Sequence, residues 1–142
     1  AIQANDFMFR KTIRDNGKAA KELLDEIKID CDDNFEMSQM VTLTSKSLDY
    51  ILENRDDQEM LSCISFDYLM GFGYLVGGWL MDKAKRSAKE QLSKTSINEI
   101  FLKSKIVSAE FYDFHILPRI DYHLKVVMKG AKVVQTANDS FI

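Results

Sequence analysis

Apolar residues recur along most of the chain at the three- and four-residue spacing of amphipathic helices, and short polar clusters separate these patterns. The first pattern contains Ile2, Phe9 and Ile13, stops at Asn16-Gly17, and resumes over residues 20–27. It predicts a helix, a break and a second short helix. The chain shows no strict alternation of apolar and polar residues, so no strand is predicted.

The acidic turn at residues 30–34 is predicted to begin the next helix, because carboxylates favour the positive end of the helix dipole. One apolar stripe follows: Met37, Met40, Val41, Thr44, Leu48, Ile51 and Leu52. The cluster at residues 54–57 is predicted to close this helix and cap the next, with Asp56 and Glu59 in a capping box. That third helix has its own stripe: Leu61, Ile64, Tyr68, Phe72, Leu75 and Trp79.

A second capping box, Ser96 with Glu99, is predicted to open a last helix that runs beyond Val134. This helix is apolar on two sides, which predicts several neighbours. One side carries Ile100, Val107, Phe111 and Phe114, and the other carries Ile106, Ala109, Ile120, Leu124, Val127, Ala131 and Val134. Pro118 removes a hydrogen bond to the Phe114 carbonyl, so a kink is expected. The predicted fold is all-α: an antiparallel bundle of about four main helices, with a broken N-terminal helix and a kinked C-terminal one.

Four glycines lie inside the third predicted helix, at Gly71, Gly73, Gly77 and Gly78. Each costs about 1 kcal/mol relative to alanine, so close approach of another backbone or a ligand is expected. Gly71 and Gly78 share one face of the helix, and Gly73 and Gly77 share another. Trp79 is expected to bury its ring if its indole N–H finds an acceptor.

The glycine-rich stretch fits neither a dinucleotide-binding loop nor a membrane span. A dinucleotide-binding fingerprint would need glycine at Val76 and a preceding strand. A membrane span needs about 20 apolar residues, whereas the uncharged run between Asp67 and Asp82 covers only 14 residues, 68–81. We therefore expect no membrane span, and we attribute the glycines to packing.

The composition is that of an ordinary globular protein, with 46% hydrophobic and 29% charged residues. A net charge of −3 gives no support for nucleic-acid binding, but residues 22–59 are acid-rich and residues 83–132 base-rich. Antiparallel neighbours with these charges attract each other. Cys31 and Cys63 are isolated, and no secretion leader opens the chain, so a reducing cytoplasm is expected.

No catalytic or metal site is recognisable. The two histidines, His115 and His123, lack the glutamate three residues earlier that a di-iron bundle requires. No serine lies in a nucleophile elbow, and neither cysteine has a recognisable partner. We expect no chemistry from this segment alone.

Two stretches resemble the helical C-terminal domain that follows the catalytic region in large bacterial acyl-CoA dehydrogenases. The first contains Gly77-Gly78-Trp79-Leu80 and, further on, Ile116-Leu117-Pro118-Arg119. The second lies at the start, where Ile2-Gln3-Ala4-Asn5-Asp6 and Asp15-Asn16-Gly17 resemble a phrase that follows the catalytic glutamate of the family. Asn16 stands where the family often has glycine, and residues 83–94 are more charged than usual.

The resemblance implies a parent oxidoreductase of fatty acid metabolism, a flavoprotein that converts acyl-CoA to enoyl-CoA with FAD. Its catalytic glutamate would precede Ala1, so no catalytic or cofactor-binding residue is carried over to this chain. By resemblance, residues 1–28 are the end of a catalytic-domain helix and a connecting helix, and residues 29–142 are the bundle domain. The expected role is packing on the upstream catalytic region or a neighbouring subunit of a homo-oligomer, and narrowing the approach to acyl-CoA.

The expected contacts of this segment use Gly71, Gly73, Gly77, Gly78, Trp79 and the bend at Pro118. A free-standing helical adaptor that binds a partner helix in a groove is the alternative. The mass and flavin content of the intact gene product distinguish the two.

Overall fold

The computed structural model describes residues 1–130 and 136–137, and all the regular structure in these residues is helical. Two segments have π-helical hydrogen bonding and are labelled η. The elements in chain order are α1 (Ile2–Asn5), η1 (Asp6–Ile13), α2 (Lys18–Asp30), α3 (Phe35–Glu53), α4 (Gln58–Lys94), α5 (Glu99–Phe111), η2 (Tyr112–Ile116) and α6 (Pro118–Lys129).

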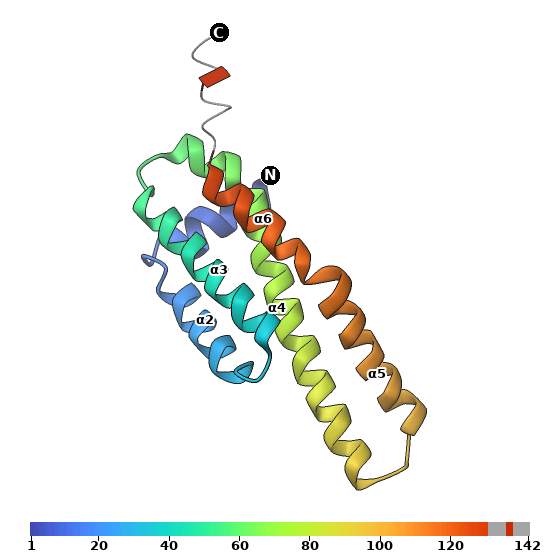
Figure 1. Ribbon diagram of the computed structural model, residues 1–142. Helices are drawn as coiled ribbons and strands as arrows, with labels where there is room; N and C mark the ends of the chain where they lie inside the picture. Colours follow the sequence, from blue (N-terminus) through green and yellow to red (C-terminus); the bar gives the residue numbers. More distant parts are fainter. Residues whose placement is uncertain (131–135, 138–142) are drawn as a thin grey trace.

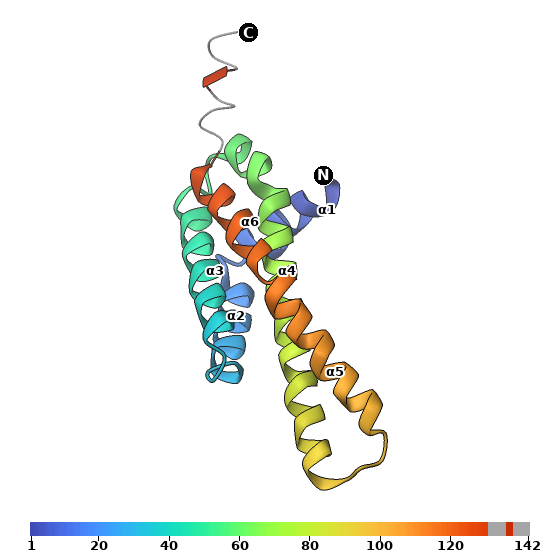
Figure 2. The same ribbon diagram turned by 45° about the vertical axis from the view of Figure 1, so that its right-hand side comes forward.

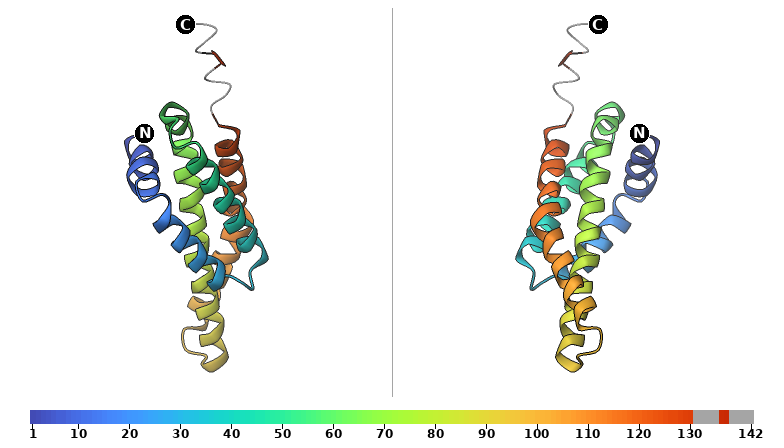
Figure 3. Two further views of the ribbon diagram at one scale, coloured as in Figure 1. Left: turned by 90° about the vertical axis from the view of Figure 1, so that its left-hand side faces the viewer. Right: turned by 90° about the vertical axis from the view of Figure 1, so that its right-hand side faces the viewer.

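Helix α4 is the central element, and α3 and the arm formed by α5, η2 and α6 run antiparallel to it (Figure 1). Beyond the turn between α2 and α3, α4 and α5 continue as a projecting two-helix hairpin (Figure 2). The short α1 and η1 lie on the other side of α4 from α6 (Figure 3). The predicted antiparallel all-α bundle is therefore confirmed.

The core is formed by the stripes that the sequence predicted. Helices α3, α4 and α6 contribute the fully buried side chains Met37, Val41, Leu48, Ile51, Leu61, Ile64, Tyr68, Leu75, Ile120, Leu124 and Val127. Met8 of η1 and Leu24 and Ile27 of α2 belong to the same cluster. The core thus extends across residue 28, and the division into residues 1–28 and 29–142 stays a prediction.

The N-terminal helix breaks where expected, because Asn16 and Gly17 have positive φ angles of 58° and 75°. Of its predicted apolar residues, Phe9 and Ile13 are partly buried against the core but Ile2 is 87% exposed, and the fully buried positions are Ala4, Met8 and Thr12. These three are four residues apart, which suits the wider turn of a π-helix better than the α-helical repeat assumed from the sequence.

The helix caps confirm one of three predictions. Asn34 caps α3, since its side-chain oxygen accepts a hydrogen bond from the Met37 amide. The cap of α4 is Asp57, which accepts from the Met60 amide, and Asp56 was therefore wrong by one residue. The capping box at Ser96 was also wrong, because α5 begins after Asn98, a left-handed residue whose side chain makes no cap.

The last predicted helix is interrupted and ends early. Pro118 begins α6, and the preceding η2 segment carries the chain past it through a hydrogen bond from the Leu117 amide to the Tyr112 carbonyl. Helix α6 ends at Gly130, whose φ of 63° and ψ of −157° are not helical. The prediction that one helix continues beyond Val134 is therefore wrong, because the helix is interrupted at Gly130. Residues 131–135 lie outside the described part.

Helix α4 is long and apolar enough in composition to cross a membrane, and 44% of its most apolar 18-residue window is buried inside the chain. Six neighbouring elements contact it: α1, η1, α3, α5, η2 and α6. A core helix of a globular bundle passes the same compositional test, and these contacts favour that interpretation.

Candidate functional site

Three of the four α4 glycines provide notches for side chains of the C-terminal arm. A Cβ placed at Gly71 would lie 2.5 Å from Cδ2 of Leu124, and one at Gly78 would lie 2.8 Å from Cδ1 of Leu117. A Cβ at Gly77 would collide with the Tyr112 hydroxyl. These glycines let α6 and η2 approach α4 closely, so their small size is needed inside the chain.

Gly73 and Gly77 share a face of α4 as predicted from their spacing, but they do not share a close contact: Gly77 is closed by Tyr112, whereas a Cβ at Gly73 would meet nothing within 4 Å. The sequence had suggested that the four glycines together require a partner outside this chain. Three of them are instead explained by contacts within the chain. Only Gly73 keeps that argument: it is exposed in the middle of α4, and its conformational cost has no compensating contact within the described residues.

Trp79 has the acceptor that the sequence required. Its indole N–H donates to Oδ2 of Asp30, at the end of α2, over 2.6 Å. Arg86 donates to the same oxygen over 2.9 Å, and the Lys83 ammonium lies 4.1 Å from the centre of the Trp79 ring. These hydrogen bonds, the one from Trp79 first, hold the pKa of Asp30 below its usual 3.8. The acidic and basic blocks of the sequence do meet here.

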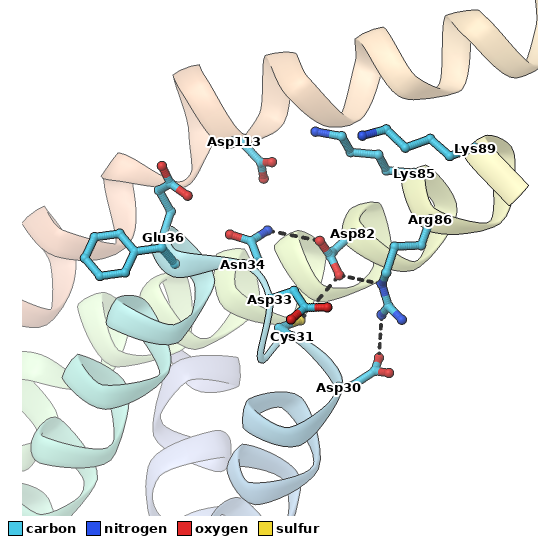
Figure 4. Close-up of a pocket in the computed structure, with 11 residues that line it drawn as sticks. Asp30, Cys31, Asp33, Asn34, Glu36, Asp82, Lys85, Arg86, Lys89 and Asp113 are labelled. Atoms are coloured by element: carbon cyan, nitrogen blue, oxygen red, sulfur yellow. Dashed lines mark hydrogen bonds and ion pairs between the residues drawn. The ribbon is translucent and has the colours of Figure 1, made fainter.

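The buried carboxylate of Asp82 connects the α2–α3 turn to α4 (Figure 4). It accepts from Nδ2 of Asn34 at 3.0 Å and from Nε of Arg86 at 2.9 Å. Because Asn34 also caps α3, one side chain joins the start of α3 to the middle of α4. Asp82 therefore holds the α2–α3 turn against α4.

A polar cleft of about 460 Å³ opens beside this junction, between the α2–α3 turn, α4 and η2 (Figure 4). Its lining includes the carboxylates of Asp30, Asp33, Glu36, Asp82 and Asp113 and the cations Lys85, Arg86 and Lys89. Asp113 projects from η2, and its Oδ1 is buried without a hydrogen-bond partner. Burial raises the pKa of Asp113, and nearby Lys85 only partly opposes that shift.

We predict that Asp113→Asn raises the free energy of unfolding at pH 7 by about 0.5–1 kcal/mol, because an ionised carboxylate is poorly solvated there. The folded-state pKa lies above the unfolded value, so this destabilisation is present at high pH and disappears as the pH falls through the folded pKa. Urea denaturation at several pH values measures it. Glu110→Gln, which removes an exposed carboxylate that also faces Lys85, is the matched control. A loss of stability in Asp113→Asn at pH 7 would contradict the prediction.

The buried cysteine and the two histidines contact neighbouring side chains of the bundle. Burial raises the pKa of the Cys31 thiol to about 12, so this thiol stays protonated at neutral pH. Nδ1 of His123 lies 2.7 Å from Oδ1 of Asp67, which joins α6 to α4, whereas His115 lies against Phe111 and Phe114. Across residues 1–130 and 136–137, no three side chains are grouped so that they could hold a metal ion.

Apolar side chains that are exposed or half-buried form two faces that the described residues cover only in part. On the first of them Phe66 contacts the ring of His123, and Tyr112 closes the same side of α4 at Gly77. The α4 face consists of Phe66, Met70, Gly73 and Leu80, which recur at helical spacing with Gly73 as a gap in the middle. The α5 face consists of Ile100, Ser104, Val107 and Phe111 of α5 together with Phe114 of η2. The predicted inner side of the last helix is confirmed at Ala109, Ile120, Leu124 and Val127, whereas Ala131 and Val134 lie outside the described residues. Its outer side has no neighbour among the residues that the structure describes.

These features define an all-helical domain whose organised polar groups serve packing. The sequence matches the family described as acetyl-CoA dehydrogenase C-terminal like over residues 16–137, and the chain belongs to that family. It is also similar to the broad-specificity linear acyl-CoA dehydrogenase FadE5 of Mycobacterium tuberculosis, with 27% identity over 146 aligned positions. That alignment covers 89% of this chain but 24% of FadE5, so the chain spans about a quarter of that relative's length.

The resemblance drawn from the sequence is therefore confirmed at the level of the family. Sequence patterns identified Trp79 and three glycines, Gly71, Gly77 and Gly78, as packing residues, but they missed Asp82 and Asp113. Both acids lie on the inward side of their helices. Each of these acids stands at a position where the helical pattern predicts an apolar residue. That mismatch was the sequence feature that could have identified them.

Proposed function

We propose that this chain is the non-catalytic C-terminal segment of an acyl-CoA dehydrogenase that oxidises acyl-CoA to enoyl-CoA with FAD. The observation that carries the proposal is the family match over residues 16–137, combined with the coverage of only a quarter of an acyl-CoA dehydrogenase relative. The polar groups of the domain support this role, since they pair within the bundle rather than converge on an open reaction centre.

The segment packs on the catalytic region through the α4 face. Phe66 and Leu80 are 55% and 56% exposed and lie two turns on either side of Gly73, where a neighbouring backbone can approach α4 without meeting a side chain. The protruding side chains and the gap at Gly73 suit a helix or an apolar loop that crosses α4 at Gly73, because Tyr112 closes the same side of α4 at Gly77. Docked in this way, the segment narrows the approach to the acyl-CoA site.

Docking is tested by mixing the separately produced upstream region with this chain and measuring binding by titration calorimetry. Gly73→Arg is expected to weaken binding by at least about tenfold, because a long charged side chain fills the gap. Thr42→Arg, on the exposed side of α3, is the matched control and should leave the affinity unchanged. Equal affinity for both variants would place the docking surface elsewhere.

The function itself is tested on the intact gene product. A yellow protein several times this mass that oxidises an acyl-CoA, while the isolated segment neither holds flavin nor turns over thioester, is the expected result. A gene product of about this mass without flavin would favour a helical adaptor. If the segment narrows the substrate approach, Gly73→Arg in the intact enzyme should change KM for acyl-CoA more than kcat.

A further inference from the structure

The outward side of α5 has the repeat of a coiled-coil seam. Within α5, Ile100, Ser104, Val107 and Phe111 follow one another at steps of four, three and four, and Phe114 follows three residues later in η2. Ile100 is 87% exposed and Phe114 78% exposed, whereas Leu102 and Ala109 on the opposite side are buried against α4. One side of α5 is therefore buried against α4, and the opposite side has no partner among the described residues.

We propose that the α5 face pairs with the same face of a second copy of this chain, with the two helices antiparallel and a two-fold axis at Val107. In this register Ile100 meets Phe114 of the partner subunit, and Ser104 meets Phe111 of the partner subunit. Each bulky ring faces a smaller residue, and Val107 meets its own copy at the centre. The seam is thus complementary to itself in size, which a two-fold interface requires.

The charges beside the seam fit the same register. Lys103 and Glu110 flank the seam on one side, each one residue before a seam position and almost equally far from Val107. The antiparallel pairing therefore brings each Lys103 to Glu110 of the partner subunit, twice per dimer. Within one chain these residues pair with Glu99 and Lys85, but the Lys103 and Glu110 side chains are 63% and 56% exposed, so both remain accessible. A parallel pairing in register would instead place Lys103 beside Ser108 of the partner subunit and would not form this charge pair.

The projecting hairpin makes this pairing feasible, since the outer side of α5 faces away from α2, α3 and the rest of the bundle (Figure 2). The α4 face lies on another helix, so the pairing goes beyond the docking proposed above and does not depend on it. A failure of one leaves the other untouched: docking is measured between this chain and the upstream region, and pairing is measured with this chain alone.

Sedimentation velocity of the 142-residue chain over a range of concentrations tests the pairing. A monomer–dimer equilibrium is expected for the wild type, and V107D should raise the dissociation constant by at least about tenfold. K103E should also weaken the dimer because it places like charges together, and K103E/E110K should restore it by exchanging the pair. K105E makes the same charge change off the seam and is the matched control. Circular dichroism verifies that each variant is folded.

Cross-linking tests the register. In a C63S background, V107C is expected to form a disulfide-linked dimer under mild oxidation, because the two-fold axis brings this position next to its copy. I100C should not cross-link, since its counterpart is Phe114 of the partner subunit. A wild-type chain that stays monomeric at all concentrations would overturn the proposal. So would a dimer that is unaffected by V107D, or one that K103E weakens and K103E/E110K does not restore.

Discussion

Replacing Gly71 by alanine is expected to lower the free energy of unfolding by about 1–2 kcal/mol, although alanine normally stabilises a helix by about 1 kcal/mol relative to glycine. The added Cβ would lie 2.5 Å from Cδ2 and 2.8 Å from Cγ of Leu124. Leu124 is 1% exposed, so its side chain has no free space into which to move. Overpacking therefore outweighs the gain in helix propensity.

The same substitution should change sign when Leu124 is shortened. Leu124→Ala by itself is expected to cost about 2–5 kcal/mol, and it vacates the space that the new methyl group needs. In that background Gly71→Ala should stabilise by about 1 kcal/mol, and a double-mutant cycle from urea denaturation measures the coupling. Gly73→Ala, which meets nothing, should stabilise the wild type and serves as the control. Stabilisation of the wild type by Gly71→Ala would refute the close contact.

Trp79→Ala is expected to lower the free energy of unfolding by about 2–3 kcal/mol, and Trp79→Phe by less than half of that. Alanine removes both the ring that packs on the core and the N–H that donates to Asp30, whereas phenylalanine removes chiefly the N–H. Trp79 is the only tryptophan in the sequence, so unfolding must be followed by circular dichroism rather than intrinsic fluorescence.

The pH dependence of Trp79→Phe separates the hydrogen bond from packing. The pKa of Asp30 is lowered in the folded state, first by Trp79 and then by Arg86. The resulting stabilisation is present above the unfolded pKa of about 3.8 and is lost as the pH falls through the folded value. The difference between wild type and Trp79→Phe should therefore shrink below that pH. A difference that stays constant with pH would assign the effect to packing alone.

The helices and most of the core could be predicted from the sequence because burial imposes a regular spacing on apolar residues. The stripe from Leu61 to Leu75 is buried as expected, and the Asn16-Gly17 break is real. The cap positions were less secure. Asp56 and Asp57 are adjacent side chains of the same chemistry, and only the backbone geometry decides which of them accepts the amide hydrogen bond.

The partners of the glycines could not be predicted, because spacing along α4 says which glycines share a side but not what faces that side. Gly77 and Gly73 share a side, yet one is closed by Tyr112 and the other is open. The junction at Asp82 was equally invisible, since it joins residues 48 positions apart through a turn whose direction depends on the whole bundle. Membership of the family was predicted from the resemblance of short motifs to a known domain, and not from the spacing of apolar and polar residues.

The η2 segment has a consequence for the evolution of this arm. A π-turn holds one more residue than an α-helix over a similar rise, and each residue adds about 100° of rotation. Removing a single residue from positions 112–116 would therefore turn the whole of α6, so that Leu124 no longer enters the notch at Gly71. Insertions and deletions in this arm should be tolerated in the 95–98 loop and selected against at η2, because the length of η2 determines which side of α6 faces α4.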